Sequence, residues 1–335
     1  MAGGQERVLR RRIRSVEATK KITRAMELIA ASQMARAQAR IAGSKPYLEG
    51  IEAVLTDVVA DGSAPGRLLG VPESPSRVGV IVIVSDRGLC GGYNSFVLRT
   101  ADRLMRTGER AGRSYRFIGV GRKALGYFRF RGRGLDATFP MGDRPTYEDA
   151  RRLAATVVPA FMQGELDLVQ LVSTRFISAG TQVVESRQLL PLDPASPRTR
   201  AAGGREGERA ALAAAAAGEA TASGPGSLAA GEGYFEYEPE PDELLALLVP
   251  RYAEAALYGA LLEASASEHV SRQRAMSAAT ENADDLITTL RRVMNRARQD
   301  AITTEIMEIV GGSEALRRGA ERKAAPQPEE IEEFA

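Results

Sequence analysis

The fold is decided by residues 264–311, which read ASASEHVSRQRAMSAATENADDLITTLRRVMNRARQDAITTEIMEIVG. Apolar or small residues recur there at alternating steps of three and four, at Met276, Ala279, Ala283, Leu286, Leu290, Val293 and Ala297. Such spacing is typical of the a and d positions of a coiled coil, which face a partner helix. Without proline from 251 to 325, residues 251–310 predict one helix about 90 Å long. One small domain cannot enclose such a helix, so its exposed end needs a partner.

A second helix is predicted at the N-terminus, over residues 5–41. Two apolar sets with helical spacing lie six residues apart, which predicts one slip in the seam; they are Leu9, Ile13 and Val16, then Ile22, Met26 and Ile29. Residues 1–45 hold eleven Lys or Arg against three Glu, a balance of +8. This charge fits either a solvated face or a surface matched to an acidic partner. A kink or break is expected near Gly43, Pro46 and Gly50.

The middle of the chain predicts an α/β domain. After a linker rich in Gly, Pro and Ser at 61–77, strands are predicted at 78–84, 115–120, 166–176 and 181–190. Helices are predicted between them, at 95–107, 123–130 and 146–161. Strands that alternate with helices indicate a mostly parallel sheet.

Domain boundaries follow from changes in composition. We predict an N-terminal helical region at 1–60, the α/β domain at 75–194 and a flexible insertion at 195–233, which is almost all Ala, Gly, Glu, Arg and Ser. The last strand and turn of the domain follow at 234–250, the C-terminal helix at 251–312 and an acidic disordered tail at 313–335.

Composition excludes several classes of site. The chain has 335 residues, one Cys and one His, so an internal disulfide is impossible and a zinc site of Cys and His nearly so. The net charge of +2 does not indicate a polyanion-binding protein as a whole. The longest apolar run, at 78–84, is far too short to span a membrane. His269, on the long helix, is expected to be solvated or interfacial.

One motif could carry chemistry. DRGLCGGYN follows the first strand and precedes a helix, and contains Asp86, Arg87, Gly88, Cys90, Gly91, Gly92 and Asn94. A glycine-rich turn there could present backbone N–H groups to a phosphate. The motif lacks both the GxGxxG spacing and the GK[ST] ending of phosphate-binding loops, which favours a tight structural turn. Cys90 is the alternative nucleophile, although His269 is far along the chain.

Three long motifs, in this order, resemble one family. TKKITRAMELIAASQMARAQAR near the N-terminus and SEHVSRQRAMSAATENADDLITTLRRVMNRARQDAITTEIMEIVGG near the C-terminus are similar to the two ends of the F-type ATP synthase gamma chain. VIVIVSDRGLCGGYN resembles its middle signature, and the resemblance covers most of residues 5–316. It implies an antiparallel coiled coil of the terminal helices and a Rossmann-like α/β domain. The pair would form a rotor shaft within a ring of three alpha and three beta chains.

The resemblance also implies contact residues. Those expected against the alpha–beta ring are Lys20, Lys21, Met26, Arg272, Arg298, Gln299 and Thr303. Tyr237 and Glu238 match the segment that faces the c-subunit ring and the epsilon chain. Beyond Ala297 the three-four pattern lapses at Asp300, and polar side chains there suit a transient ring contact.

The implied protein is a non-catalytic subunit without cofactor or metal. One copy per complex would lie on the cytoplasmic face of a bacterial membrane, with the delta chain as an indirect partner, membrane contact only through the c ring and no nucleic acid. The 195–233 insertion has no Cys, which excludes regulation by a pair of cysteines within it. We hypothesise that the insertion restrains rotation in the hydrolysis direction. An α/β enzyme that uses DRGLCGG, and a coiled-coil adaptor or nucleic-acid binder, remain as alternatives.

Overall fold

The computed structural model describes residues 2–60, 68, 74–192 and 240–324, and it falls into two compact units. Unit 1 joins Met1–Glu27 to Met276–Ala335, and unit 2 is Leu28–Ala275. The predicted roles of Tyr237, Glu238 and the 195–233 insertion lie outside the described residues, as does the strand expected just after the insertion. The elements are α1 (Ala2–Ala60), β1 (Arg77–Ile83), α2 (Tyr93–Arg110), β2 (Ser114–Val120), α3 (Arg122–Phe130), β3 (Ala137–Phe139), α4 (Tyr147–Met162), β4 (Leu168–Phe176), β5 (Gln182–Leu190) and α6 (Pro241–Ala324).

Unit 2 is built on a five-stranded sheet in the order β3-β2-β1-β4-β5. The first four strands in that order are parallel, and β5 pairs antiparallel with β4. The central strand β1, RVGVIVI, is buried at every position after Arg77, as expected for a strand covered on both faces. This confirms the predicted α/β class with a mostly parallel sheet, and adds the short strand β3, which the sequence pattern does not reveal.

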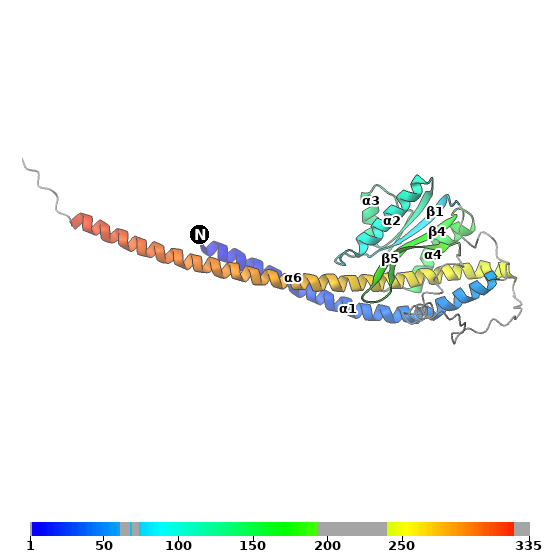
Figure 1. Cartoon of the computed structure of the whole chain (residues 1–335), viewed down its shortest axis with the longest axis horizontal. Helices are drawn as coiled ribbons and strands as arrows, with labels where there is room; N and C mark the ends of the chain where they lie inside the picture. Colours follow the sequence, from blue (N-terminus) through cyan, green and yellow to red (C-terminus); the bar gives the residue numbers. More distant parts are fainter. Residues whose placement is uncertain (1, 61–67, 69–73, 193–239, 325–335) are drawn as a thin grey trace, which may run out of the picture. The chain divides into compact units, whose positions relative to one another are not determined.

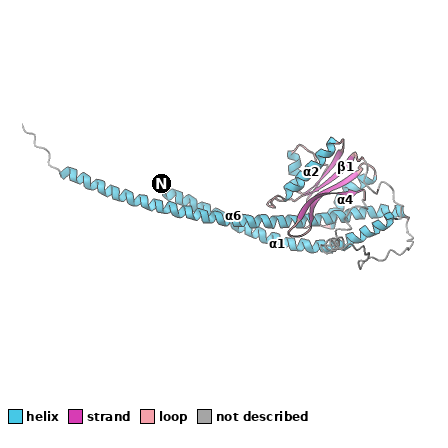
Figure 2. Cartoon of the chain, in the orientation of Figure 1, coloured by secondary structure: helices cyan, strands magenta, loops and turns pink. Residues whose placement is uncertain are grey.

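Helices cover both faces of this sheet (Figure 1). On one face, α2 and α3 pack through residues such as Val97, Met105 and Phe128 onto alternate residues of β1. On the other face, α4 and the 245–264 part of α6 pack on Ile81 and Ile83, and residues of α1 such as Leu55 join the same core. Figure 2 shows the strands gathered between these helices.

Local signals explain how the elements begin. Thr146 caps α4 in a capping box: the Thr146 hydroxyl accepts from the Asp149 N–H at 3.3 Å, and the Asp149 carboxylate accepts from the Thr146 N–H at 2.8 Å. Gly121, between β2 and α3, has φ +93, and a Cβ there would lie 2.1 Å from the Val84 oxygen. Only glycine fits that close approach.

The two long helices differ from their predicted bounds. α1 continues through Pro46, so the predicted break does not occur there, and α6 begins at Pro241, ten residues before the predicted start. α6 also continues through residues 313–324, which the sequence analysis assigns to a disordered tail. Packing explains the first two differences, because Leu48, Leu55, Leu245 and Val249 all belong to the unit 2 core or pack against it.

α6 also contains a window with the composition of a membrane span. Its 18-residue window reaches a mean hydropathy of 1.3, and half of that window is buried inside the protein. The core helix of a water-soluble protein has the same properties, and the buried half matches the α6 residues that cover the sheet.

Candidate functional site

In unit 1, α1 and α6 pair as antiparallel helices. Glu17 binds Arg291 at 2.7 Å, Lys20 binds Asp284 at 2.5 Å, and the Thr23 and Thr280 hydroxyls lie 2.8 Å apart. Residue numbers rise along α1 as they fall along α6. Ile13, Ile287 and Leu290 form the apolar centre of the pair, with Leu9, Val16 and Met294 against it.

The register of this seam differs from the predicted one. The α6 positions that face α1 are Met276, Thr280, Ala283, Ile287, Leu290 and Met294. Three predicted seam residues, Ala279, Leu286 and Val293, therefore sit one position off. Ile287 is 5% exposed, whereas Leu286 is 40% exposed. Both patterns alternate steps of three and four, because apolar neighbours such as Leu286 and Ile287 occur in pairs.

The α1 seam has no slip. Its inward positions follow the three-four spacing through Val16, Lys20, Thr23, Glu27 and Ala30, all of them buried or half-buried. Ile22 and Ile29, which the sequence pattern places in the seam, are each 61% exposed. Polar residues thus occupy part of the seam, and large apolar residues point away from it.

The outward surface of unit 1 is therefore rich in apolar side chains. Exposed residues there include Val8, Ile22, Leu286 and Val293, and on the last part of α6 Ile302, Ile306, Met307, Ile309, Val310 and Leu316. A shallow pocket lies between the start of α1 and α6. Gln5 lines it from α1, and Val293, Ala297, Ala301 and Thr304 line it from α6. From Ile302 to Ser313, α6 is exposed at every residue. An apolar surface this extensive indicates a partner.

The predicted ring-contact residues separate into two groups. Lys21, Arg298, Gln299 and Thr303 are exposed on the helices, and Met26 is half-buried. Lys20 lies on the seam with Asp284. Gln299 and Thr303, four residues apart on α6, share one helix face. The exposed side chains of Lys21, Arg298, Gln299 and Thr303 are accessible to another molecule.

Arg272 has different surroundings, deep in unit 2. Its guanidinium donates to the Glu268 carboxylate at 2.5 Å and to the Gly88 carbonyl at 3.3 Å, and the residue is 6% exposed. Burial raises the pKa of Glu268, and the Arg272 charge opposes that rise. His269 beside it is also buried rather than solvated, and burial lowers its pKa. Arg272 therefore clamps α6 to the DRGLCGGYN turn.

The turn itself is held in place by hydrogen bonds and an ion pair within unit 2. The Asp86 carboxylate accepts from the backbone N–H of Arg122 at 2.8 Å and of Gly142 at 3.0 Å. Asn94 binds Ser85 through both its amide nitrogen and its oxygen. Arg87 pairs with Asp143. Gly91 has φ +57, a conformation that favours glycine.

Nucleophilic chemistry does not fit Cys90. The residue is 1% exposed, and burial raises the pKa of its thiol, so the reactive thiolate is disfavoured. Among the described residues, no group of three or more His, Cys, Asp or Glu side chains is placed to hold a metal ion. The hydrogen bonds of Asp86 and Asn94 hold the turn within unit 2, which is compatible with the tight structural turn that the sequence favours.

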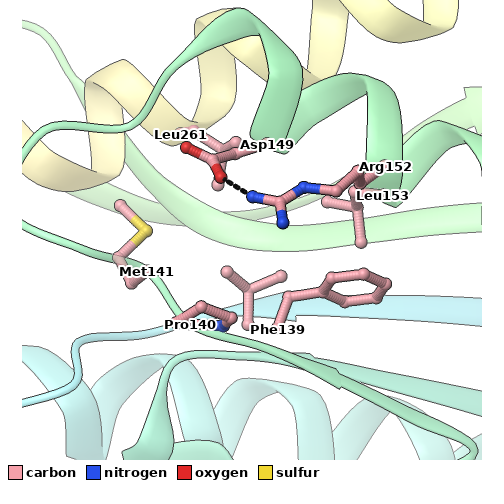
Figure 3. Close-up of a pocket in the computed structure, with 8 residues that line it drawn as sticks. Phe139, Pro140, Met141, Asp149, Arg152, Leu153 and Leu261 are labelled. Atoms are coloured by element: carbon pink, nitrogen blue, oxygen red, sulfur yellow. Dashed lines mark hydrogen bonds and ion pairs between the residues drawn. The ribbon is translucent and has the colours of Figure 1, made fainter.

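Two pockets lie among the described residues of unit 2, and neither supplies a further candidate site. One lies between α4 and β2–β3, holds about 10 Å³ and is lined by Phe139, Met141, Leu153 and Leu261 beside the Asp149–Arg152 ion pair (Figure 3). That volume is about one water molecule. A second, open pocket of about 410 Å³ lies beside Cys90, and its charged group, Arg274, already donates to the Gly180 carbonyl at 3.0 Å.

Comparisons with known proteins agree on one family. The family model described as ATP synthase matches residues 5–316. A relative named ATP synthase gamma chain from Parafrankia sp. (strain EAN1pec) is 44% identical over 322 residues, which cover 95% of this chain and 99% of the relative. A relative of the same name from Streptomyces coelicolor is 39% identical over 319 residues, with 94% and 97% covered.

Solved structures show the same fold. A chain of the Euglena gracilis mitochondrial ATP synthase, in a structure of OSCP/F1/c-ring, aligns with TM-score 0.59 and 18% identity, covering 98% of this chain and 99% of that chain. A chain of the Tetrahymena thermophila mitochondrial ATP synthase central stalk and c-ring aligns with TM-score 0.52 and 24% identity, covering 77% and 99%.

Proposed function

The chain belongs to the ATP synthase gamma chain family, and from this membership we propose that it is the central rotor shaft of a proton-translocating F-type ATP synthase. Rotation of a membrane c ring turns the shaft, and the shaft drives the beta-chain catalytic sites through their conformational cycle. The observation that carries the proposal is the match over residues 5–316, together with an antiparallel helix pair whose outward face is apolar.

The physical properties of unit 1 suit a shaft. A shaft must be stiff, and two helices held by a seam and by cross-helix ion pairs are stiffer than one. It must also slide past three equivalent partners. Exposed Val and Ile side chains provide contact area without hydrogen bonds that would fix one orientation, so differential contacts can bias each partner in turn.

We further propose that the chain is non-catalytic and uses no cofactor. Buried Cys90 and the internally bonded turn support this reading. Ring contact is proposed for Lys21, Met26, Arg298, Gln299 and Thr303, whereas the burial of Arg272 favours a structural role. We propose the epsilon chain as a further partner and the delta chain as an indirect one. Each complex would hold one copy of this chain, on the cytoplasmic face of a bacterial membrane.

Reconstitution tests the central claim. The alpha and beta chains of the same organism are co-expressed with and without this chain, and ATP hydrolysis is measured on the purified complexes. We expect co-purification with both partners and strong hydrolysis only in the presence of the chain. A Gln299→Ala/Thr303→Ala variant should assemble but hydrolyse more slowly, and Glu308→Ala, on the same exposed helix, is the matched control. Failure of the wild-type chain to co-purify would refute the proposal.

A further inference from the structure

In unit 1, α6 carries two sets of residues that could pack against α1. The observed seam consists of Met276, Thr280, Ala283, Ile287, Leu290 and Met294. The alternative seam, which the spacing of apolar residues predicts, consists of Met276, Ala279, Ala283, Leu286, Leu290, Val293 and Ala297. The two seams share three residues and otherwise exchange a residue for its neighbour. Because neighbouring helix residues point about 100° apart, a turn of α6 about its own axis by roughly 50° converts one seam into the other.

Apolar packing hardly distinguishes the two seams. Ile287 is 5% exposed and Leu286 is 40% exposed, yet the two side chains contain the same number of carbons. Further along α6, the exchange is between Met294 and Val293, which are both apolar. The α1 side chains around Ile287 can pack on either set, because all of them are apolar, namely Leu9, Ile13 and Val16. Since the free energy of burial follows apolar area, the two seams are close in energy.

Polar contacts between the helices do distinguish them. The observed seam buries Thr280 where the alternative seam would bury Ala279, so it accepts a hydroxyl that apolar packing alone would not favour. Thr280 is 8% exposed, and its hydroxyl lies 2.8 Å from that of Thr23. Two ion pairs lie beside this contact and complete a set that we call the register lock: Thr23–Thr280, Lys20–Asp284 at 2.5 Å and Glu17–Arg291 at 2.7 Å.

The positions of the lock residues around α6 make their contacts specific for one seam. Thr280, Asp284 and Arg291 are separated by four and seven residues, so they lie on one flank of the observed seam. Leu286 and Val293 lie on the opposite flank, also seven residues apart. A turn of α6 that brings Leu286 and Val293 against α1 therefore carries Asp284 and Arg291 away from it. All three contacts of the register lock would be lost in that turn.

We propose that the register lock selects the observed seam over the alternative seam, and so fixes which apolar side chains the helix pair turns outward. With the lock in place, Ile287 is covered, while Leu286 and Val293 stay on the outward surface. Coiled coils use polar partners in this way to choose between pairings of similar energy. The inference goes beyond the proposed function and does not depend on it, because both helices belong to this chain.

Disulfide cross-linking of the purified full-length chain tests the proposal. Thr23→Cys/Thr280→Cys reports the observed seam, and Thr23→Cys/Ala279→Cys reports the alternative seam. Both reporters lack the Thr23 hydroxyl and keep the two ion pairs, so their initial cross-linking rates can be compared on non-reducing gels. The chain with Cys90 alone, which is buried, is the blank. We expect the first reporter to cross-link faster, and faster cross-linking of the second would overturn the proposal.

Charge reversal in both reporters provides the perturbation, and charge exchange is its matched control. Asp284→Lys/Arg291→Glu places like charges across both ion pairs, and should shift the ratio of the two rates toward the alternative seam roughly 30-fold, about fivefold for each pair. Adding Lys20→Asp/Glu17→Arg restores opposite charges and should restore the original ratio. An unchanged ratio after reversal, equal slowing of both reporters, or no recovery after exchange would overturn the proposal. If circular dichroism shows that the reversed variant is unfolded, Arg291→Glu alone, with Glu17→Arg as its control, should still shift the ratio about fivefold.

Discussion

Replacing Ile287 with alanine should open the seam of unit 1, whereas replacing its neighbour Leu286 should not. Ile287 is buried against Ile13 and Leu290, while Leu286 points outward. Ile287→Ala removes three buried carbons, which costs about 2.4 kcal/mol at about 0.8 kcal/mol per carbon. The better helix propensity of alanine returns a few tenths, so the net cost is about 2 kcal/mol. Leu286→Ala should cost less than about 0.5 kcal/mol, because little contact is lost.

Hydrogen exchange measures this difference locally. Amides of α6 between Thr280 and Ala297 should exchange roughly 30-fold faster in Ile287→Ala, the factor that corresponds to about 2 kcal/mol. The same amides in Leu286→Ala should exchange within about twofold of wild type. Strand β1, in unit 2, provides an internal reference that should change in neither variant. Equal acceleration in both variants, or a larger effect of Leu286→Ala, would show that the register deduced from burial is wrong.

Three further predictions follow from polar contacts. Thr23→Val should destabilise the helix pair by about 1 kcal/mol, and a double-mutant cycle with Thr280→Val should show a coupling of similar size; additive effects would contradict the 2.8 Å hydrogen bond. Arg272→Met should lower the free energy of unfolding of unit 2 by about 3 kcal/mol, because Glu268 is left buried without its cation, whereas the exposed Arg298→Met should leave it unchanged; equal melting temperatures would refute the clamp. Hydrogen bonds from Arg77 and Ser76 hold the pKa of Asp167 well below its usual range, so its stabilisation is complete above about pH 4 and is lost as the pH falls toward the folded-state pKa. The urea midpoint of Asp167→Asn should therefore fall less between pH 5 and pH 3 than that of the wild type, by about the share that Asp167 contributes.

Much of the fold could be predicted from local pattern. β1 announces itself as a β-branched run followed by glycines, and the strands and helices after it alternate as a parallel sheet requires. Short β3 has only three residues and no such run, so its pairing with β2 cannot be seen without the neighbouring strand. The predicted helix ends are wrong where packing outweighs the effect of a proline, as at Pro46 and Pro250.

The seam register could not be decided from one helix. Leu286 and Ile287 are equally apolar, and the choice between them depends on which residues of α1 lie opposite. A search for apolar positions also misses Lys20 and Thr23, because the seam accepts them only with Asp284 and Thr280 as partners. Ile22 and Ile29 mislead the same search, because both are apolar and yet each is 61% exposed.

The candidate site shows the same limit. Arg298, Gln299 and Thr303 match family positions and are exposed, which leaves their ring contact as a proposal. Arg272 matches one as well, yet the Gly88 carbonyl, 184 residues away in sequence, helps to bury it.

The pairing of α1 with α6 has a consequence during synthesis. Thr23 and Thr280 are 257 residues apart, so at 5–20 residues per second α1 leaves the ribosome roughly 13 to 50 s before its partner helix exists. The sheet can assemble in that interval, because β1 to β5 are all contained in residues 77–190. The first helix to be synthesised is therefore the last to pack against its partner helix. Until then the face of α1 that is buried in the folded protein, from Ile13 to Ala37, is exposed and can bind any chaperone that recognises exposed apolar helices.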